Sequence, residues 1–436
     1  SSLRRRLRTI SSSDHLYLRL PSGLIKYVAL KALRGSNVAS LGKFGSFDLE
    51  DLEGVPYGWT WEIGPPKESN ESETESKGDE GTAAKTNATN EDIYDDPSRP
   101  SDPEAGSRHL TMLDIQALKS SGLEGQALID NLTKASSSFE KRTVFSQDKF
   151  VRRKEAKHLR LFTPIPPTLA TLVEYNFGTL ASGGATGQPD KVRGMRLDTV
   201  SQMLSSANVG AGGRYLVVDG TSGGLLIAAC LERMGGRGRL IAVHDYEVAP
   251  EWEMVKAMNL PPSSYAPEVL TGVNWAQLDP SGDGEDEEFP EVPEHLSLSE
   301  YSKSSPENVK LHRLRDRERS KALKKYAAVS ALRSLRDEIL QRPGSFDGLL
   351  VSSPHDAYSV LSTLLPLLKG SGSFVLHSPY MQPLVETHAA LRGREDVVNV
   401  GLSEPWIRRW QVLPGRTHPE MMTSSTGGYL LSGVRV

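Results

Sequence analysis

The sequence predicts an α/β protein whose larger, C-terminal part is built on a parallel sheet covered by helices. In residues 214–246, two short apolar runs enclose a longer apolar segment that ends at Gly235 and Gly236. Short apolar runs bounded by glycine are typical of buried strands, and the longer segment is typical of a helix. A strand–helix–strand unit implies parallel strands with helices on both faces of the sheet.

The N-terminal part is predicted to be a small β-barrel domain. Short, partly alternating runs in residues 15–63 are separated by Gly, Pro and Ser, which is typical of a small barrel or a curled sheet. Trp59 and Trp61 lie two residues apart and would share one face of a strand. Packing in the core and binding of RNA are both possible uses of these side chains.

Composition limits the classes of function. A chain of 436 residues exceeds one ordinary domain, and its formal net charge of −4 means that any nucleic-acid surface must be local. The one cysteine, Cys230, excludes an intrachain disulfide or a multi-cysteine zinc site; we expect it to be a buried core residue and predict no metal site. No apolar run approaches the roughly 18 residues of a membrane helix. The Arg- and Ser-rich residues 1–13 fit either a targeting segment or a basic tail.

Shifts in composition divide the chain into four segments. Two stretches are acidic and poor in apolar side chains, and we expect both to be disordered, because they bury too little surface to offset their ordering entropy. The segments are the β-barrel domain (1–66), the first acidic insert (67–108), a helical connector (109–190) with a basic helix at 146–162, and the sheet domain (191–436), which contains the second acidic insert at about 279–309.

The basic helix predicted at 146–162 is a candidate phosphate-binding surface. Ser146 is predicted to cap it. Its cations recur at spacings that place them on one face: Lys149, Arg153, Lys157 and Arg160, flanked by Arg152 and Lys154. Both a solvated charged face and a phosphate-binding face fit this pattern. The basic first half of residues 310–341 leaves the same two alternatives.

The glycine-rich loop of the 214–246 unit resembles motif I of class I S-adenosylmethionine (SAM) methyltransferases. In that motif an acidic residue is followed by three alternate glycines, which let the backbone turn tightly and approach the cofactor. Aligned from Asp219, the three glycine places hold Thr221, Gly223 and Leu225. With one glycine of three left, the resemblance implies a methyltransferase fold whose cofactor pocket has been lost.

A second methyltransferase feature is also altered. Residues 346–351 predict a buried strand, which corresponds to the fourth strand of the methyltransferase pattern. Enzymes that methylate an adenine nitrogen carry an acid or amide with a Pro-containing turn after it, to orient or deprotonate the nucleophile. Here Ser352 and Ser353 precede Pro354, and Asp356 lies two residues too late. We expect His355 to be an ordinary loop residue.

Longer stretches resemble one family. They are FSQDKFVRRKEAKH, GMRLDTVSQML, LERMGG, and SEPWIRRWQVLPGRTHP followed by GGYLLSG. Together they resemble the non-catalytic subunit of the eukaryotic tRNA (adenine-N1)-methyltransferase, the Gcd10-like family, over most of the chain from residue 17 onward, outside the acidic inserts. The resemblance implies an N-terminal β-barrel domain and a C-terminal Rossmann-like class I methyltransferase domain that binds no SAM.

The resemblance also implies partners and sites. It implies a nuclear heterotetramer with two copies each of this chain and of a SAM-binding catalytic subunit, which methylates adenosine 58 in the T loop of tRNA. This chain would help to hold the tRNA, with no catalytic residue of its own. The candidate tRNA-binding residues are Lys149, Arg152, Arg153, Lys154, Lys157, Arg160, Arg408, Arg409, Arg416 and His418.

Two other functions stay open. The chain could be an active SAM-dependent RNA methyltransferase, with Asp219 and Gly223 at the cofactor and Asp245 or Glu247 on its ribose, because an acid at the end of the second strand is the expected ribose ligand. It could also be a general RNA-binding or translation-associated module that acts through the barrel without methylation.

Overall fold

A computed structural model describes the chain, which divides into two compact units. One unit contains Thr168–Phe177 and Gln188–Val436, and the other contains Leu7–Pro167. The residues whose structure is described are 9–29, 38–41, 44–63, 118, 125–136, 139–177, 189–220, 222–246, 249–278, 291–292, 314–327, 329–330, 344–408, 410–412, 415, 417–419 and 426–436. Both predicted acidic inserts fall almost wholly outside these residues.

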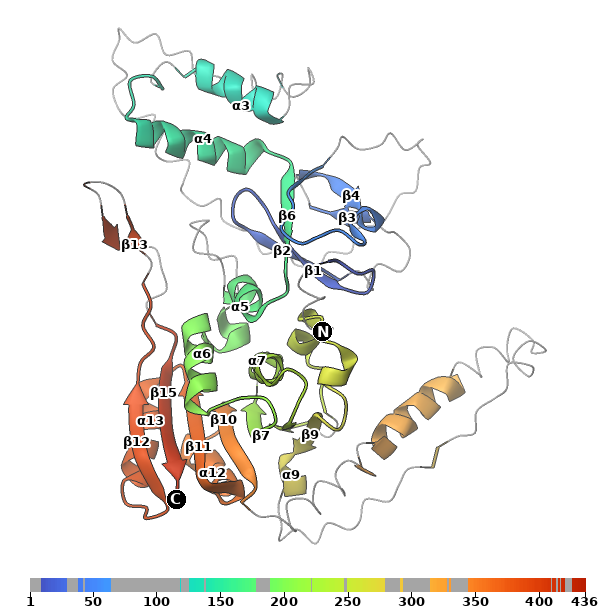
Figure 1. Ribbon diagram of the computed structural model, residues 1–436, viewed down its shortest axis with the longest axis vertical. Coiled ribbons are helices and arrows are strands. Elements are labelled where there is room, and N and C mark those ends of the chain that lie inside the picture. The colour runs from blue at the N-terminus through green and yellow to red at the C-terminus, as the bar shows by residue number, and fades with distance from the viewer. Residues whose placement is uncertain are drawn as a thin grey trace, which may run out of the picture. The chain divides into compact units, whose positions relative to one another are not determined.

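The larger unit is organised on a seven-stranded sheet (Figure 1), in the order β12-β15-β11-β10-β7-β8-β9. The strands from β9 to β11 are parallel, and β15 runs antiparallel to both β11 and β12. Their bounds are β7 Arg214–Asp219, β8 Arg239–His244, β9 Leu270–Asn274, β10 Phe346–Ser352, β11 Leu368–Ser378, β12 Val397–Ser403 and β15 Tyr429–Arg435. The strand order reverses between β7 and β10, which makes this a Rossmann-like, doubly wound sheet.

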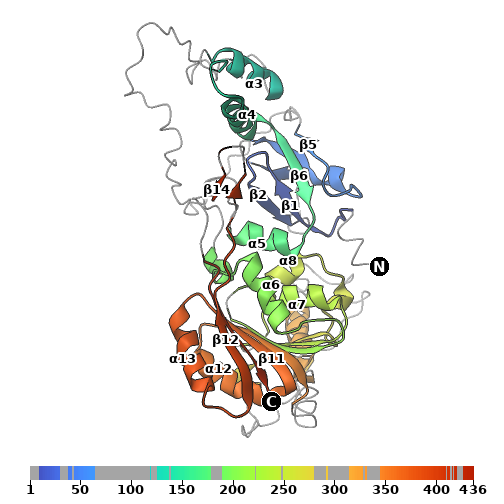
Figure 2. The same cartoon turned by 60° about the vertical axis from the view of Figure 1, so that its left-hand side comes forward.

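Helices pack on the strands that they connect. Helices α6 and α7 pack together, α7 against β7 and β8 and α6 against β11 and β15. Helices α12 and α13 lie side by side (Figure 2), and α13 contacts β11, β12 and β15. The bounds are α5 Leu169–Phe177, α6 Leu197–Ser206, α7 Leu225–Met234, α8 Glu253–Ala257, α9 Trp275–Leu278, α12 Ala357–Leu364 and α13 Met381–Leu391, with a further helix at 314–327.

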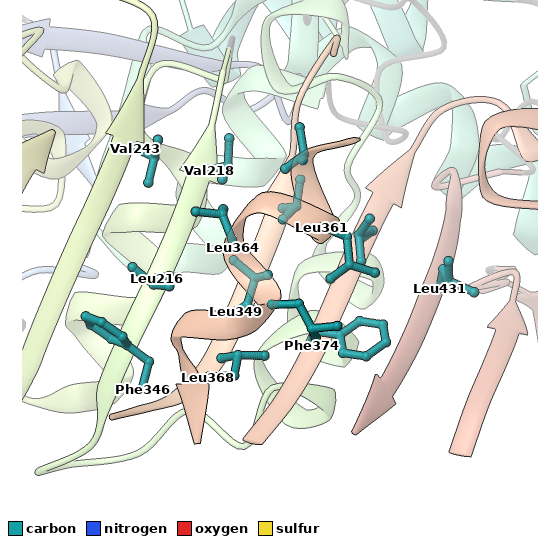
Figure 3. Close-up of a cluster of buried hydrophobic side chains, with 14 of the residues drawn as sticks. Leu216, Val218, Val243, Phe346, Leu349, Leu361, Leu364, Leu368, Phe374 and Leu431 are labelled. Atoms are coloured by element: carbon teal, nitrogen blue, oxygen red, sulfur yellow. The ribbon is translucent and has the colours of Figure 1, made fainter. Parts of the chain in front are cut away.

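The core explains why the sequence pattern was informative here. Alternate side chains of β7 and β10, such as Leu216 and Leu349, pack with Leu361 of α12 and Phe374 of β11 (Figure 3), and all four are fully buried. Since both faces of these strands are covered, they are continuous apolar runs in the sequence. The predicted α/β, Rossmann-like domain is confirmed. Cys230 of α7 is buried as expected, and burial raises the pKa of its thiol.

The predicted N-terminal barrel is not confirmed. The described strands of the smaller unit form an open four-stranded sheet in the order β2-β1-β6-β5 and a separate two-stranded sheet of β3 and β4, with no closed barrel among them. The bounds are β1 His15–Arg19, β2 Ile25–Ala29, β3 Val38–Ser40, β4 Ser46–Asp48, β5 Trp61–Glu62 and β6 Leu161–Ile165. Trp61 packs partly against the core of this unit, whereas Trp59 precedes the strand and is 63% exposed.

The basic helix ends earlier than predicted. Helix α4 spans Val144–His158 and packs beside α3, Gly125–Lys134. The side chain of Thr143, rather than Ser146, accepts the capping hydrogen bond, which comes from the Ser146 amide (3.4 Å). At the other end Leu159 turns into an extended conformation, and β6 follows, pairing with β1. Arg160 therefore lies outside the helix, because pairing with a distant strand replaces the last predicted turn.

The described residues meet neither the requirements for a membrane-spanning helix nor those for a metal site. Among them, no helix is long and apolar enough to cross a bilayer. Nor do His, Cys, Asp and Glu side chains gather there in a group of three or more that could hold a metal ion.

Candidate functional site

The carboxyl ends of β7, β8 and β10 form the edge at which a doubly wound sheet binds its ligand. The strand order reverses between β7 and β10, and their last residues, Asp219 and Ser352, lie side by side in the ladder. In a methyltransferase this edge would hold SAM. The side chains of the loops that follow these strands decide whether this chain can do the same.

Both carboxylate oxygens of Asp219 are bonded within the chain. One accepts hydrogen bonds from the Ser222 amide (3.1 Å) and hydroxyl (2.5 Å), and the other accepts one from the Leu226 amide (3.0 Å). Burial raises the pKa of this carboxyl group, and these hydrogen bonds oppose the rise. Asp219 therefore holds the glycine-rich loop onto the first turn of α7. Leu225, the first residue of α7, is fully buried.

The glycine-rich loop is in close contact with the start of α8. Gly224 has a φ of 91°, and a Cβ atom built on it would lie 2.7 Å from the Cβ of Trp252. The amide of Met254 also donates to the carbonyl of Gly223 (3.2 Å). A glycine is thus needed at 224 both for its left-handed backbone and for close approach, but what approaches is a tryptophan of the same chain. Thr221, the other altered loop position, lies outside the described residues.

A side-chain bridge joins the loops after β8 and β10. Nε2 of His355 lies 2.8 Å from Oδ1 of Asp245, with side-chain exposures of 49% and 41%. The ring of Trp275 meets the His355 ring edge-on, with 6.4 Å between centroids. Asp245 is the acid that would bind the ribose of SAM, so its pairing opposes that role; Glu247, its alternative, lies outside the described residues. His355, expected to be an ordinary loop residue, has a specific partner.

The positions that would act on an adenine are used for structure. Oγ of Ser352 lies 3.1 Å from Nδ1 of His377, and Nε2 of His377 donates to the carbonyl of Gly427 (3.3 Å). Burial lowers the pKa of His377 to about 4, so the ring is neutral at pH 7. Asp356 accepts the Ser359 amide (2.8 Å) as the N-cap of α12. Among the described residues at this edge, the Ser352 hydroxyl and the Asp356 carboxylate are thus both engaged within the chain.

The predicted cationic face is present on α4. Lys149, Arg153 and Lys157 are exposed at successive four-residue spacings, with Arg152 exposed beside them, and none of these four makes an ion pair within the described part of the chain. Lys154 differs, since its amine lies 5.2 Å from the centre of the Phe150 ring and its side chain is half-buried. No side chain of α4 is fully buried.

The second group of predicted tRNA contacts lies on a projecting segment after β12. Its ends are anchored by α6: Arg196 donates to the carbonyl of Pro405 (3.4 Å), and Thr199 donates to that of Gly427 (2.9 Å). Arg408 is half-buried over the Trp406 ring (5.5 Å), and His418 is exposed on the short strand β14, His418–Pro419, which pairs with β13, Trp410–Gln411. Arg409 and Arg416 lie outside the described residues.

The same segment exposes large apolar side chains. Trp406, Ile407, Trp410 and Val412 are 62%, 57%, 57% and 75% exposed, and we call these four residues the apolar arm. A soluble chain seldom leaves such a group uncovered unless another molecule covers it. The arm is therefore a candidate protein-binding surface.

Comparison with known proteins identifies the family. Residues 9–302, more than half of the chain, match the sequence model of the Gcd10p family. The chain belongs to the Gcd10p family. This confirms the resemblance that the sequence motifs predicted.

Relatives in this family match nearly the whole chain. A protein of Debaryomyces hansenii named tRNA (adenine(58)-N(1))-methyltransferase non-catalytic subunit TRM6 is 28% identical, over 98% of this chain and 86% of its own. A Schizosaccharomyces pombe protein of the same name is 29% identical, over 99% and 93%. Among solved structures, a SAM-dependent O-methyltransferase from Thermotoga maritima matches with a TM-score of 0.46 at 12% identity, covering 98% of this chain and 95% of that one.

Three features of this Gcd10p-family chain were not predicted from its sequence. The contact of Trp252 with Gly224 and the bridge from Asp245 to His355 join residues 28 and 110 positions apart, and no local pattern reveals such pairs. The apolar arm did leave a signal, since residues 406–419 are rich in tryptophan and lack any core-facing period. That combination indicates exposure to a partner more directly than contact with RNA.

Proposed function

We propose that this chain is the non-catalytic subunit of a tRNA (adenine-58, N1)-methyltransferase. The observation that supports the proposal is a Rossmann-like sheet in which side chains at the ligand-binding edge contact one another, with Trp252 against the glycine-rich loop and Asp245 paired with His355. Relatives that match over nearly the full chain carry the same name. The chemistry is then done by a catalytic partner that binds SAM, and this chain positions the tRNA.

The apolar arm supports the requirement for a partner. Interfaces concentrate their binding energy in a few buried aromatic anchors, and the arm offers Trp406 and Trp410 on a segment that α6 holds at both ends. We propose that the arm docks on the catalytic subunit, in a heterotetramer with two copies of each chain, and that the complex acts in the nucleus. The heterotetramer and its location rest on the family resemblance.

The cations of α4 support the second task, which is holding the tRNA backbone. Lys149, Arg153 and Lys157 repel one another at four-residue spacing, at a cost of about 0.2–0.5 kcal/mol for each adjacent pair. No described acid neutralises them, so phosphate binding would relieve this cost. Phosphate contacts fix the position of a nucleic acid without reading its bases, which suits a subunit that presents tRNA to another active site.

Neutralising α4 is expected to reduce the salt dependence of tRNA binding. In the complete complex, Arg153→Gln with Lys157→Gln should reduce the log–log slope of affinity against salt by roughly 1.5, since each phosphate that a cation neutralises contributes about 0.7–0.9. Lys134→Gln with Lys141→Gln removes the same charge from exposed positions of the same unit and is the control. Equal slopes for the two double variants, measured by filter binding at several salt concentrations, would remove α4 from the tRNA surface.

The purified chain is expected to give no heat of binding when SAM is titrated into it. Trp252 lies against the glycine-rich loop and Asp245 is paired with His355, so we expect any affinity for SAM to be weaker than about 1 mM, which corresponds to about 4 kcal/mol of binding free energy. The catalytic partner is the positive control in the calorimeter, and tRNA binding by the complete complex shows that the chain is folded. Micromolar SAM affinity would instead favour an active methyltransferase.

A further inference from the structure

A second basic surface lies on the helix at 314–327, in the larger unit (the orange helix in Figure 1). Its sequence, LRDRERSKALKKYA, carries six basic and two acidic residues, which gives a net charge of +4 over 14 residues. Every residue is exposed except Arg319 and Ala322, which are half-buried. The helix is thus polar or charged on nearly all sides, and little of it packs against the protein.

A helix of this kind lacks the usual source of stability. Most helices in proteins are held by the packing of an apolar face, and isolated helices of about this length are marginal in water. Here the larger apolar side chains Leu314 and Leu323 are 55% and 45% exposed. One described ion pair reaches the helix, from Lys324 to Glu251 at 3.8 Å between exposed side chains, and such pairs contribute little.

The cations of this helix are arranged in a stripe. Arg317, Lys321 and Lys325 recur every four residues, so they lie on one face and span about 12 Å along the axis. All three are exposed, and none makes an ion pair with a residue that the structure describes. Like charges at this spacing destabilise a helix. Glu318 lies three residues before Lys321, but no ion pair between the stripe and a described residue offsets the repulsion, whereas a row of phosphates would.

The same arrangement occurs on α4, where Lys149, Arg153 and Lys157 are exposed at the same spacing in the other unit. Each of these two helices carries the same repeat of exposed cations, which suits a polyanion with regularly spaced charges. Acidic protein surfaces seldom present charges as a regular row, while a nucleic-acid backbone does.

We propose that the 314–327 helix is a second tRNA-binding element, which holds the phosphate backbone through Arg317, Lys321 and Lys325. The inference rests on the proposed tRNA-binding function and adds a contact to it from the methyltransferase-like unit. We expect the contact to be independent of base sequence, because contacts to phosphates fix the position of a nucleic acid without reading its bases.

The test compares salt dependence in the complete complex with a tRNA transcript. The triple variant Arg317→Gln, Lys321→Gln and Lys325→Gln should reduce the log–log slope of affinity against salt by about 2 to 3, one increment of 0.7–0.9 for each phosphate that is no longer neutralised. Glutamine has a helix propensity close to that of lysine and arginine, so the helix should persist. Circular dichroism and the size of the complex check that fold and assembly are unchanged.

A matched pair of single variants tests whether tRNA binding depends on the stripe or only on the net charge of the helix. Lys321→Gln lies at the centre of the stripe, whereas Arg315→Gln lies on the same helix about 120° away and removes the same charge. We expect Lys321→Gln to lower the slope by nearly one and Arg315→Gln to leave it unchanged. Equal effects of the two variants would overturn the proposal that the stripe is the tRNA-binding face of this helix.

The remaining outcomes distinguish the inference from the function on which it rests. If the triple variant binds tRNA like the wild type, while the α4 double variant shows the expected decrease, the 314–327 helix does not touch tRNA but the proposed function stands. If adding this chain to the catalytic subunit gives no salt-dependent tRNA affinity at all, the proposed function fails. Failure of the triple variant to assemble would assign the stripe to a protein partner and overturn the inference.

Discussion

Replacing Trp406 and Trp410 by alanine is expected to release the catalytic partner from this chain. Aromatic anchors at the centre of an interface each contribute about 2 kcal/mol or more, so the double variant should weaken the complex by about 1,000-fold. Both side chains are more than half exposed in the isolated chain, so their removal should cost little folding stability. Titration calorimetry with the purified catalytic subunit measures the effect directly.

The chain supplies its own control for this experiment. Trp59 is 63% exposed, like Trp406, but lies in the other compact unit. Trp59→Ala should leave the affinity for the catalytic subunit unchanged and shows that removing an exposed tryptophan is harmless in itself. An undiminished affinity of the Trp406→Ala, Trp410→Ala variant would place the interface elsewhere and leave the arm without an assigned partner.

Protonation of His377 is expected to destabilise the larger unit as the pH falls. Burial lowers the pKa of the folded-state ring from 6.5 to about 4. Between these two pH values His377 is protonated in the unfolded chain but neutral in the folded chain. The free energy of unfolding therefore decreases as the pH falls from about 6.5 to 4. The shift of about 2.5 pKa units corresponds to roughly 3 kcal/mol. Urea denaturation at several pH values measures this slope.

A glutamine at this position separates His377 from the carboxyl groups that also titrate in acid. His377→Gln keeps an N–H donor for the carbonyl of Gly427 but cannot take up a proton, so it should lose stability less steeply between pH 6.5 and 4. His418→Gln, at an exposed histidine of the same unit, is the control for removing one imidazole. If wild type and His377→Gln show parallel slopes, the buried ring is not what makes the fold acid-sensitive.

The sequence predicted the large sheet well because its strands are covered on both faces. Burial of β7, β8 and β10 made them apolar runs that local patterns reveal. The smaller unit was harder, since β5 has two residues and β6 pairs with β1 from far along the chain. A barrel was inferred from short runs and from the family resemblance, and nothing local showed that their described pairing stays open.

At the candidate site, the sequence shows single altered residues but not the pairs of residues that meet only in the fold. The substitution of Leu225 in the glycine motif was visible in the sequence, and so were the cations of α4. The partner of His355 was not, because Asp245 lies 110 residues away and the two meet only when the sheet forms. The sequence therefore predicted an altered glycine-rich loop but could not show which side chains contact one another at this edge of the sheet.

The position of strand β6 in the sequence determines when the smaller unit's four-stranded sheet can form during synthesis. Strand β6 pairs with both β1 and β5, so β1 and β5 cannot be joined in one sheet until residue 165 has been synthesised. At about 5–20 residues per second, the ribosome needs on the order of 10 s to proceed from β1 to β6. During that interval one edge of β1 has no partner in the sheet and is open to wrong pairing. The nascent chain thus exposes an unpaired strand edge before the larger unit has been synthesised.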